Sequence, residues 1–316
     1  MIPDKEGKVS VVTVLYNSTG VIENLLDSIR KTNEDGLVSE VIVIDNKSQD
    51  NSVDVVEKYV AEQAQNLGYE IKLIKNEKNL GFGRGNNVGA RLAIQQFILF
   101  SNPDIEFKDG VVGDMAGLLI ENPKVGLVGP RIYFDTFSAH INPIFNPPVF
   151  ILRSFFSNMK LGKLLGIKSV QPGEYRKSFQ VVGAYMMVRT NEFLKVGGFD
   201  EDNFLYLEEL MLSERLRNVG LETVKLWTSQ EVDHRIAHSQ FIVSNDTRRA
   251  SVTKLDLYLQ AERHYIENYM YNLIGNPVLD FVIRQIVRLI YKMRNSILAK
   301  PLYQRWLKFV EKDVVR

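Results

Sequence analysis

The stretch from Val9 to Asn46 reads VSVVTVLYNSTGVIENLLDSIRKTNEDGLVSEVIVIDN and holds a strand, a helix and a second strand. Val9–Leu15 is a short apolar run rich in β-branched residues, and Val41–Ile44 is a second one. Between them, Val21–Lys31 places its apolar residues at helical spacing. Continuously apolar strands are typical of a parallel sheet covered on both faces. The stretch therefore predicts a βαβ unit.

The same alternation continues along the chain. Further helices are predicted at Ser52–Ala64 and Asn86–Gln96, and further strands at Ile71–Ile74 and Phe97–Phe100. Because each helix connects two apolar strands, the crossovers imply an α/β fold with a doubly wound, mostly parallel sheet and helices on both faces.

Beyond the fourth strand the pattern changes. Arg131–Lys177 is rich in Pro and Phe and is interpreted as a long excursion, after which regular structure resumes at Phe179–Val188. A helix is expected from about Tyr206, and from about Ser251 the pattern is wholly helical. We therefore expect one domain over residues 1–245, with a first part of about 1–130 and a second of about 131–245, and a helical C-terminal extension over 246–316.

The composition excludes several classes of protein. With 316 residues, 45% of them hydrophobic and 24% charged, the chain is an ordinary globular one. The absence of cysteine excludes disulfides and thiolate sites and fits a cytoplasmic location. The polar Met1–Lys8 indicates no signal peptide, and the apolar runs are interrupted by Lys or Arg before they reach membrane-spanning length.

Polar residues follow three of the predicted strands. Tyr16-Asn17 follows the first, Asp45-Asn46 the second and Asn102-Pro103-Asp104 the fourth. Singly, each would be explained as a helix cap or a turn. Ligands of open parallel sheets bind at the carboxyl ends of the strands, so three such ends in succession favour a polar ligand. Asp104 suits Mg²⁺, which takes few protein carboxylates, whereas Glu106 is expected to be solvated.

A glycine-rich segment, Asn79–Gly89, precedes the helix predicted from Asn86 and reads NLGFGRGNNVG. Glycines allow a backbone to approach a ligand closely, and a helix N-terminus attracts anions. The segment is no dinucleotide fingerprint, because the third required glycine falls at Asn86, and it lacks the Gly-Lys-Ser/Thr of a P-loop. A structural turn is the simpler explanation of these glycines.

Acidic and histidine residues form two further candidate groups. Gly197–Glu201 precedes the adjacent Glu208 and Glu209, which suit a general base presented into a cleft or, more simply, acids that complement a helix dipole. His234 and His238 have the spacing of a zinc pair, but the glutamate of a metalloprotease is absent. One of these histidines is therefore a ligand of Mg²⁺ or Mn²⁺, a contact of a diphosphate or a structural loop residue.

In this order, the motifs resemble those of family 2 glycosyltransferases. The resemblance covers roughly Val9 to Ser239 and is closest to the rhamnosyltransferase-like branch that builds bacterial surface polysaccharides. It is carried by Tyr16-Asn17, Ile44-Asp45-Asn46-x-Ser48-x-Asp50, Asn79-x-Gly81-Phe82-Gly83-x-Gly85-Asn86-Asn87-x-Gly89, Asn102-Pro103-Asp104, Gly183-Ala184 and Gly197-Gly198-Phe199-Asp200-Glu201.

The resemblance implies a GT-A catalytic domain over 1–245, with the nucleotide-sugar part first and the acceptor part second. It implies transfer with inversion from a nucleotide-sugar, either dTDP-rhamnose or a UDP-sugar, to a polysaccharide or lipid-linked acceptor, with Mg²⁺ or Mn²⁺ as cofactor. Asp104 and His234 would bind the metal, and Glu209, next to Glu208, would be the base. The implied donor-binding residues are Tyr16, Asn17, Asp45, Asn46, Gly81, Gly83, Arg84, Asn87 and Asn102.

One segment departs from the family pattern. The family has Glu-Asp-x-Asp where this chain has Glu208-Glu209-Leu210-Met211. Glu209 therefore stands in the position of the usual catalytic aspartate and reaches one methylene further. Met211 removes the second acid, which leaves open an unusual acceptor or a weakened enzyme.

The C-terminal segment is basic. Asp280–Arg316 holds nine Lys or Arg against three Asp or Glu, a net charge of +6, in a chain whose net charge is +1. Val278–Leu298 has amphipathic spacing. Such a helix could lie on an anionic membrane surface at the inner face of the cell membrane. Packing on the catalytic domain or in a homodimer is the alternative.

Other functions remain as alternatives. The departures at Glu209 and Met211 allow a non-catalytic sugar-nucleotide-binding protein. A sugar nucleotidyltransferase would need a more basic glycine-rich loop than one with Arg84 alone. The broken fingerprint disfavours an NAD-dependent oxidoreductase, and nothing suggests binding of nucleic acid, since the basic residues lack interleaved aromatics.

Overall fold

The computed structural model describes residues 7–134 apart from 34 and 64, residues 172–234, and scattered positions between 257 and 285. The chain divides into two compact units, Met1–Leu255 and Asp256–Arg316. The described positions of the second unit include helical ones, such as Phe281 and Gln285. The predicted boundary at 245 and most of the basic C-terminal segment lie outside the described residues. Among those described, no helix is long and apolar enough to cross a membrane.

The first unit alternates strands and helices over most of its described length. Its strands are β1 (Val9–Leu15), β2 (Val38–Asp45), β3 (Glu70–Lys75), β4 (Phe97–Ser101), β5 (Val125–Pro130), β6 (Ile132–Phe134), β7 (Tyr175–Lys177), β8 (Tyr185–Arg189), β9 (Glu222–Leu226) and β10 (Val232–His234). Its helices are α1 (Ile22–Thr32), α2 (Ser52–Gln63), α3 (Phe82–Leu92), α4 (Val111–Glu121), α7 (Thr190–Lys195) and α8 (Glu208–Asn218).

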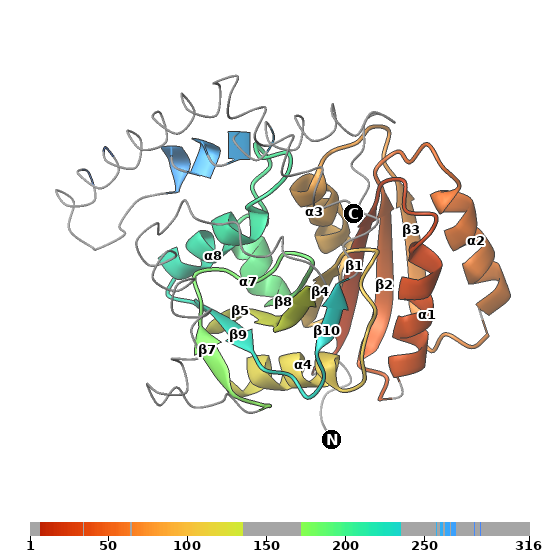
Figure 1. Ribbon diagram of the computed structural model, residues 1–316, viewed down its shortest axis with the longest axis horizontal. Coiled ribbons are helices and arrows are strands. Elements are labelled where there is room, and N and C mark those ends of the chain that lie inside the picture. Colours follow the sequence, from red (N-terminus) through yellow and green to blue (C-terminus); the bar gives the residue numbers. More distant parts are fainter. Residues whose placement is uncertain are drawn as a thin grey trace, which may run out of the picture. The chain divides into compact units, whose positions relative to one another are not determined.

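The main sheet of the described residues has the strand order β3-β2-β1-β4-β8-β5-β9-β7 (Figure 1). Neighbouring strands from β3 to β4 are parallel, as are β5 and β9. β8 runs antiparallel to β4 and β5, and β7 runs antiparallel to β9. A small parallel pair is formed by β6 and β10. The predicted mostly parallel α/β sheet is confirmed.

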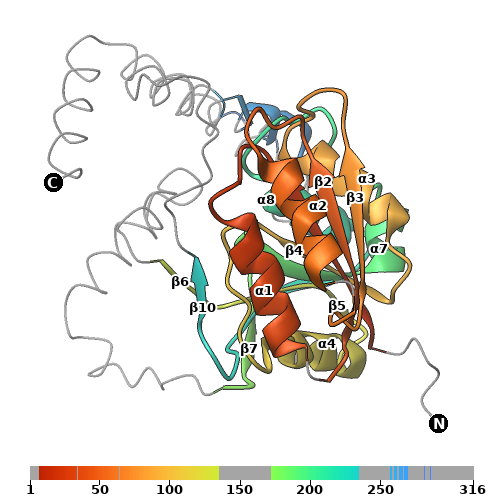
Figure 2. The ribbon, with the colours of Figure 1, turned by 90° about the vertical axis from the view of Figure 1, so that its right-hand side faces the viewer.

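The sheet buries an apolar cluster against each face. One cluster combines β1 residues such as Val11 with residues of α1, α2 and α4, and the other combines β1 residues such as Val12 with α3, α7 and α8. The two helical layers lie on opposite sides of the sheet in Figure 2. Because successive side chains of a strand point to opposite faces, a continuously apolar strand supplies both clusters.

The structure corrects the position of the third predicted helix. The helix begins at Phe82 rather than Asn86, so that most of the glycine-rich segment lies inside α3. The glycines let the helix lie close on the sheet: a Cβ at Gly89 would stand 2.5 Å from Val12 Cγ1. The helix ends at Leu92 rather than Gln96, because the Ile94 N–H donates to the Glu40 carboxylate of β2 at 2.8 Å.

The helix that carries the candidate base also begins later than predicted. The structure starts α8 at Glu208 rather than near Tyr206. Tyr206 and Leu207 have φ values of 76° and 63°, in the left-handed region that a right-handed helix cannot include. The backbone therefore turns sharply just before the two glutamates.

Candidate active site

The ends of three neighbouring strands meet at one edge of the sheet. β1 pairs in parallel with both β2 and β4, with Leu15 opposite Asp45 and Thr13 opposite Ser101. The polar residues that follow these strands therefore lie at one edge, as the sequence predicts. This edge is where open α/β sheets bind ligands.

Hydrogen bonds join the loops after β1 and β2. The Asn17 N–H donates to Ser48 Oγ at 3.0 Å, and the Gln49 N–H donates to Asn17 Oδ1 at 2.7 Å. The carboxylate of Asp45, 4% exposed, accepts the Ser48 N–H at 3.1 Å. These contacts fit the explanation of Asn17 and Asp45 as turn residues. The contact of these two residues with a donor stays a prediction.

Asn46 connects the end of β2 to the start of α3. Its buried side chain donates to the Gly81 carbonyl at 2.9 Å and accepts from Asn76 Nδ2 at 2.8 Å. Gly81 has φ 83°, and a Cβ there would stand 2.2 Å from the Phe204 carbonyl oxygen. Only glycine fits at this position. Gly83 lies against Phe199 and the Glu208 side chain, at 3.2 and 3.4 Å from its ideal Cβ.

A cavity of about 220 Å³ opens beside these loops. Its polar lining includes two predicted donor residues, Tyr16 and Asn102, and both candidate bases, Glu208 and Glu209. The other lining residues are mostly small or apolar: Val14, Ser18, Phe82, Pro103, Gly183, Ala184, Leu205, Tyr206 and Leu207. The apolar lining residues Leu205 and Leu207 could not be assigned to the site from the sequence, because no motif discussed above includes them.

The two glutamates of the cavity have different surroundings. Glu208 points toward α3, is 3% exposed, and has no hydrogen-bond partner for Oε1. Glu209 is partly exposed, and its Oε2 would stand 3.1 Å from a Cβ on Gly183. Met211 is fully buried and does not line the cavity. Glu209 is thus the more accessible acid.

Burial changes the acidity of both glutamates. Burial, with a smaller contribution from the charge of Glu209, raises the pKa of Glu208 to about 8. Burial raises the pKa of Glu209 to about 7. A carboxylate whose pKa lies close to the working pH is a better proton acceptor than an ordinary glutamate. The pair can therefore hold one proton on Glu208 and accept another on Glu209.

Asp104 lies beside a second cavity of about 600 Å³, lined mainly by α1 and the 103–109 loop. Pro103, the residue before Asp104, lines both cavities. Its side chain is buried, with 6% exposure of the residue. Within the described residues no group of three or more acidic or histidine side chains could hold a metal alone. One buried carboxylate nevertheless fits Mg²⁺ or Mn²⁺, whose remaining ligands can be phosphate oxygens and water.

Two further residues are relevant to the metal site, Glu106 as a solvated acid and His234 as a ligand. Glu106 is 41% exposed and forms an ion pair with Lys108 at 3.0 Å, as expected for a solvated side chain. His234 ends β10, opposite Phe134 of β6, and its side chain lies outside the described residues, as does His238. Whether His234 binds a metal therefore stays a prediction.

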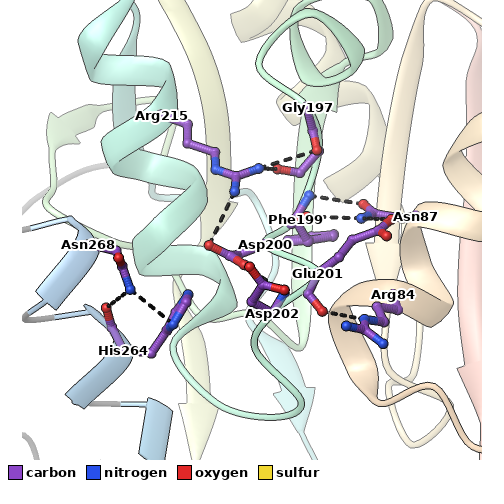
Figure 3. A network of polar contacts seen from close by, with 11 residues as sticks. Arg84, Asn87, Gly197, Phe199, Asp200, Glu201, Asp202, Arg215, His264 and Asn268 are labelled. Atoms are coloured by element: carbon purple, nitrogen blue, oxygen red, sulfur yellow. Dashed lines mark hydrogen bonds and ion pairs between the residues drawn. The ribbon is translucent and has the colours of Figure 1, made fainter.

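Two predicted donor residues on α3, Arg84 and Asn87, face the segment before α8. Arg84 Nε donates to the Glu201 carbonyl, and Asn87 Nδ2 donates to the Phe199 carbonyl at 2.9 Å (Figure 3). Both side chains thus connect α3 to the segment that leads to Glu208. Their predicted contact with the donor is not tested by these bonds.

The family of the chain follows from comparison with known proteins. A family model described as glycosyl transferase family 2 matches residues 10–173, which include every strand end and the glycine-rich segment discussed above. The chain belongs to this family. The resemblance inferred from the motifs is confirmed.

Three curated relatives are named as enzymes that transfer a sugar. The chain is 26% identical over 247 residues to an N-acetylglucosaminyl-diphospho-decaprenol L-rhamnosyltransferase of Mycobacterium tuberculosis, over 72% of this chain and 76% of that protein. It is 27% identical over 228 residues to rhamnosyltransferase WbbL of Escherichia coli, over 67% and 78%. It is 22% identical to the low-salt glycan biosynthesis hexosyltransferase Agl10 of Haloferax volcanii, over 93% and 88%.

Solved structures support the fold. Mannosyltransferase PcManGT of Pyrobaculum calidifontis, in complex with GDP-Man and Mn²⁺, matches with a TM-score of 0.55 and 14% identity, over 95% of this chain and 82% of that one. TarS 1-349 of S. aureus matches with a TM-score of 0.52 and 18% identity, over 72% and 60%. The GT-A fold expected from the motifs is confirmed.

Proposed function

We propose that this glycosyltransferase transfers a 6-deoxyhexose, rhamnose, from a nucleoside-diphosphate donor to a hydroxyl of a lipid-linked or polysaccharide acceptor, with inversion. In this proposal Glu209 is the base and Asp104 the metal ligand. Tyr16, Asn17, Asp45 and Asn102 contact the donor, whereas the fully buried Asn46, also predicted from the motif, connects β2 to α3.

One observation carries the proposal: the small cavity combines an apolar wall with two acids. Its volume of about 220 Å³ is below the roughly 300–1,000 Å³ of pockets for drug-sized ligands, so it suits one sugar residue rather than a whole nucleotide sugar. Phe82, Leu205 and Leu207 offer an apolar surface to the methyl group of a 6-deoxy sugar. Against a hydroxymethyl group they would leave a polar atom without a partner, which disfavours an ordinary hexose.

The chemistry is a single displacement. Glu209 accepts the proton of the acceptor hydroxyl on a carboxylate oxygen, while the acceptor oxygen forms a bond to the anomeric carbon. The bond from that carbon to the diphosphate oxygen breaks on the opposite side, which inverts the configuration. Asp104 would hold a divalent metal, which when bound stabilises negative charge on the departing diphosphate.

Glu208 remains protonated while Glu209 acts as the base. Burial and the neighbouring carboxylate favour its neutral form near pH 7, so that only one negative charge is present in the cavity. The burial of Met211 away from the cavity supports an active enzyme. The two acids that line the cavity, Glu208 and Glu209, are both present.

The relatives support the donor and acceptor classes. The Mycobacterium tuberculosis protein is named for rhamnosyl transfer to a diphospho-decaprenol acceptor, which favours a lipid-linked acceptor here. The Haloferax relative is named a hexosyltransferase, which keeps a hexose as the competing sugar. A lipid-linked acceptor would place the enzyme at the inner face of the cell membrane, where the basic segment after Val278 could contact anionic lipid.

The test is a donor panel with lipid-linked acceptors, with and without Mg²⁺ or Mn²⁺. Release of dTDP from dTDP-rhamnose is expected to require both acceptor and metal, and the product should have the inverted linkage. Faster turnover of a UDP-hexose would contradict the 6-deoxy assignment. Binding of nucleotide sugars without turnover on any acceptor would instead indicate a non-catalytic sugar-nucleotide-binding protein.

A further inference from the structure

The segment between α7 and α8, residues 197–207, carries the two glutamates to the cavity. It ends at Tyr206 and Leu207, which both have left-handed backbone conformations. Non-glycine residues keep such conformations only when the surrounding contacts hold them. Within the segment, Asn203 Nδ2 donates to the Tyr206 carbonyl at 2.7 Å. The position of Glu209 therefore depends on what holds residues 197–207.

Asn87 of α3 holds the middle of this segment. The Phe199 N–H donates to Asn87 Oδ1 at 2.9 Å, and Asn87 Nδ2 donates to the Phe199 carbonyl at 2.9 Å and to Glu201 Oε1 at 3.1 Å (Figure 3). Asn87 is 3% exposed. A Cβ at Gly198 would stand 2.5 Å from Asn87 Oδ1, so the glycine before Phe199 makes room for this side chain.

Glu201 extends the connection to α3. Its carboxylate forms an ion pair with Arg91 at 3.2 Å, and its carbonyl accepts from Arg84 Nε. The hydrogen bond from Asn87 is the main reason that the pKa of Glu201 is lowered, which keeps this carboxylate charged. Further along, the Phe82 N–H donates to the Phe204 carbonyl at 3.1 Å. Helix α3 thus bonds to the segment at three successive places.

Contacts with α8 and with two phenylalanine rings hold the first part of the segment. Arg215 of α8 donates to the Gly198 carbonyl at 3.0 Å and forms an ion pair with Asp200 at 3.2 Å. The Phe199 ring packs edge-on against Phe100 and Phe193, with centroids 4.9 and 5.1 Å apart. Beyond Asp200, α3 bonds to the segment at Glu201 and Phe204.

We propose that Asn87, together with Glu201, positions Glu208 and Glu209 in the cavity. Asn87 is then a positioning residue that acts through residues 197–207, in place of the donor contact predicted from the motif. This inference rests on the proposed function, in which Glu209 accepts the acceptor proton.

The variant Asn87→Asp tests the inference with little change of volume. It removes both donated bonds and places a carboxylate beside Glu201. The chain offers a matched control in Asn33, whose Nδ2 donates to the Val38 carbonyl at 2.9 Å and whose Oδ1 accepts the Val38 N–H at 2.9 Å. Val38 begins β2, at the end opposite to the cavity, so Asn33→Asp removes a donated side-chain bond away from the site and keeps the accepted one.

Asn87→Asp is expected to lower kcat by about tenfold to a hundredfold, the cost of displacing a catalytic group by about 1 Å. The donor KM should remain unchanged, and the low-pH limb of the kcat profile should move from its midpoint of about 7. Asn33→Asp should leave kcat, the donor KM and the low-pH limb unchanged, although it also lowers the urea midpoint. Glu201→Gln, which keeps the acceptor for Asn87, should retain more activity than Glu201→Ala.

Two results would overturn the inference in an active enzyme. A raised donor KM with unchanged kcat in Asn87→Asp would make Asn87 a donor contact, and equal losses of kcat in both asparagine variants would make its role structural. Hydrogen exchange tests the same inference without turnover: amides of residues 203–209 should exchange faster in Asn87→Asp but not in Asn33→Asp. If they do not, α3 does not hold the segment. Failure of the proposed function would appear separately, as a wild-type protein that transfers no sugar.

Discussion

Replacing Glu208 by glutamine should make the folded protein more stable at alkaline pH. Glu208 is 3% exposed, its Oε1 has no hydrogen-bond partner, and its pKa is raised from 4.5 to about 8. The folded state therefore keeps a proton that the unfolded state releases near pH 4.5. Between these two pKa values the unfolded state binds fewer protons, so stability falls as pH rises.

The size of the effect follows from the shift in pKa. Each pKa unit corresponds to about 1.36 kcal/mol, so ionising Glu208 costs the folded state up to about 5 kcal/mol above pH 8. Part of this free-energy cost comes from repulsion between the Glu208 and Glu209 carboxylates. Glutamine has the same shape without the charge. Glu208→Gln should thus equal the wild type at pH 5, and be more stable by about 2–4 kcal/mol at pH 9.

The measurement is urea unfolding at pH 5, 7 and 9. Glu214→Gln is the matched control, because Glu214 lies on the same helix and is 5% exposed but is paired with Arg217 at 2.7 Å. Because Glu214→Gln loses the ion pair with Arg217, this variant should show no gain in the free energy of unfolding at pH 9. A Glu208→Gln variant whose stability difference from wild type does not change between pH 5 and pH 9 would refute the reasoning.

Three further predictions concern the base, the helix α3 and the metal. The kcat of the wild type should rise with pH around a midpoint of about 7, because Glu209 must lose its proton first; a midpoint near 4.5 would assign the base elsewhere. Gly89→Ala should lower the free energy of unfolding by about 1–3 kcal/mol, because its methyl group would stand 2.5 Å from Val12. Gly117→Ala, with nothing within 4 Å of the added methyl group, should raise it by up to about 1 kcal/mol. Equal effects of the two variants in urea unfolding would contradict the close packing of α3. Asp104→Asn should abolish the stimulation of turnover by Mn²⁺ while wild-type turnover stops in EDTA, and wild-type turnover unaffected by EDTA would exclude the metal role of Asp104.

The expected sheet was confirmed because its signals are local. Phe97–Phe100 is apolar at every position and Val9–Leu15 at all but Ser10 and Thr13, as expected for strands covered on both faces. The two runs match β1 and most of β4. Asp45 and Asp104 could be placed at one edge from the sequence alone, since parallel strands bring their carboxyl ends together. The family pattern added the expectation that Glu209 is the base, which the sequence could not derive from spacing.

The tertiary structure decided the parts that depend on contacts between distant residues. The glycines of Asn79–Gly89 looked like a turn in sequence, and only their packing on β1 and β2 shows why they belong to a helix. Asn87 forms a hydrogen bond to Phe199, 112 residues away, and the periodicity of a sequence cannot predict such a pair. Strand patterns are repeated at fixed spacing and can be read from a sequence. The left-handed backbone at Tyr206, and the direction in which each glutamate points, are set by single contacts across the fold.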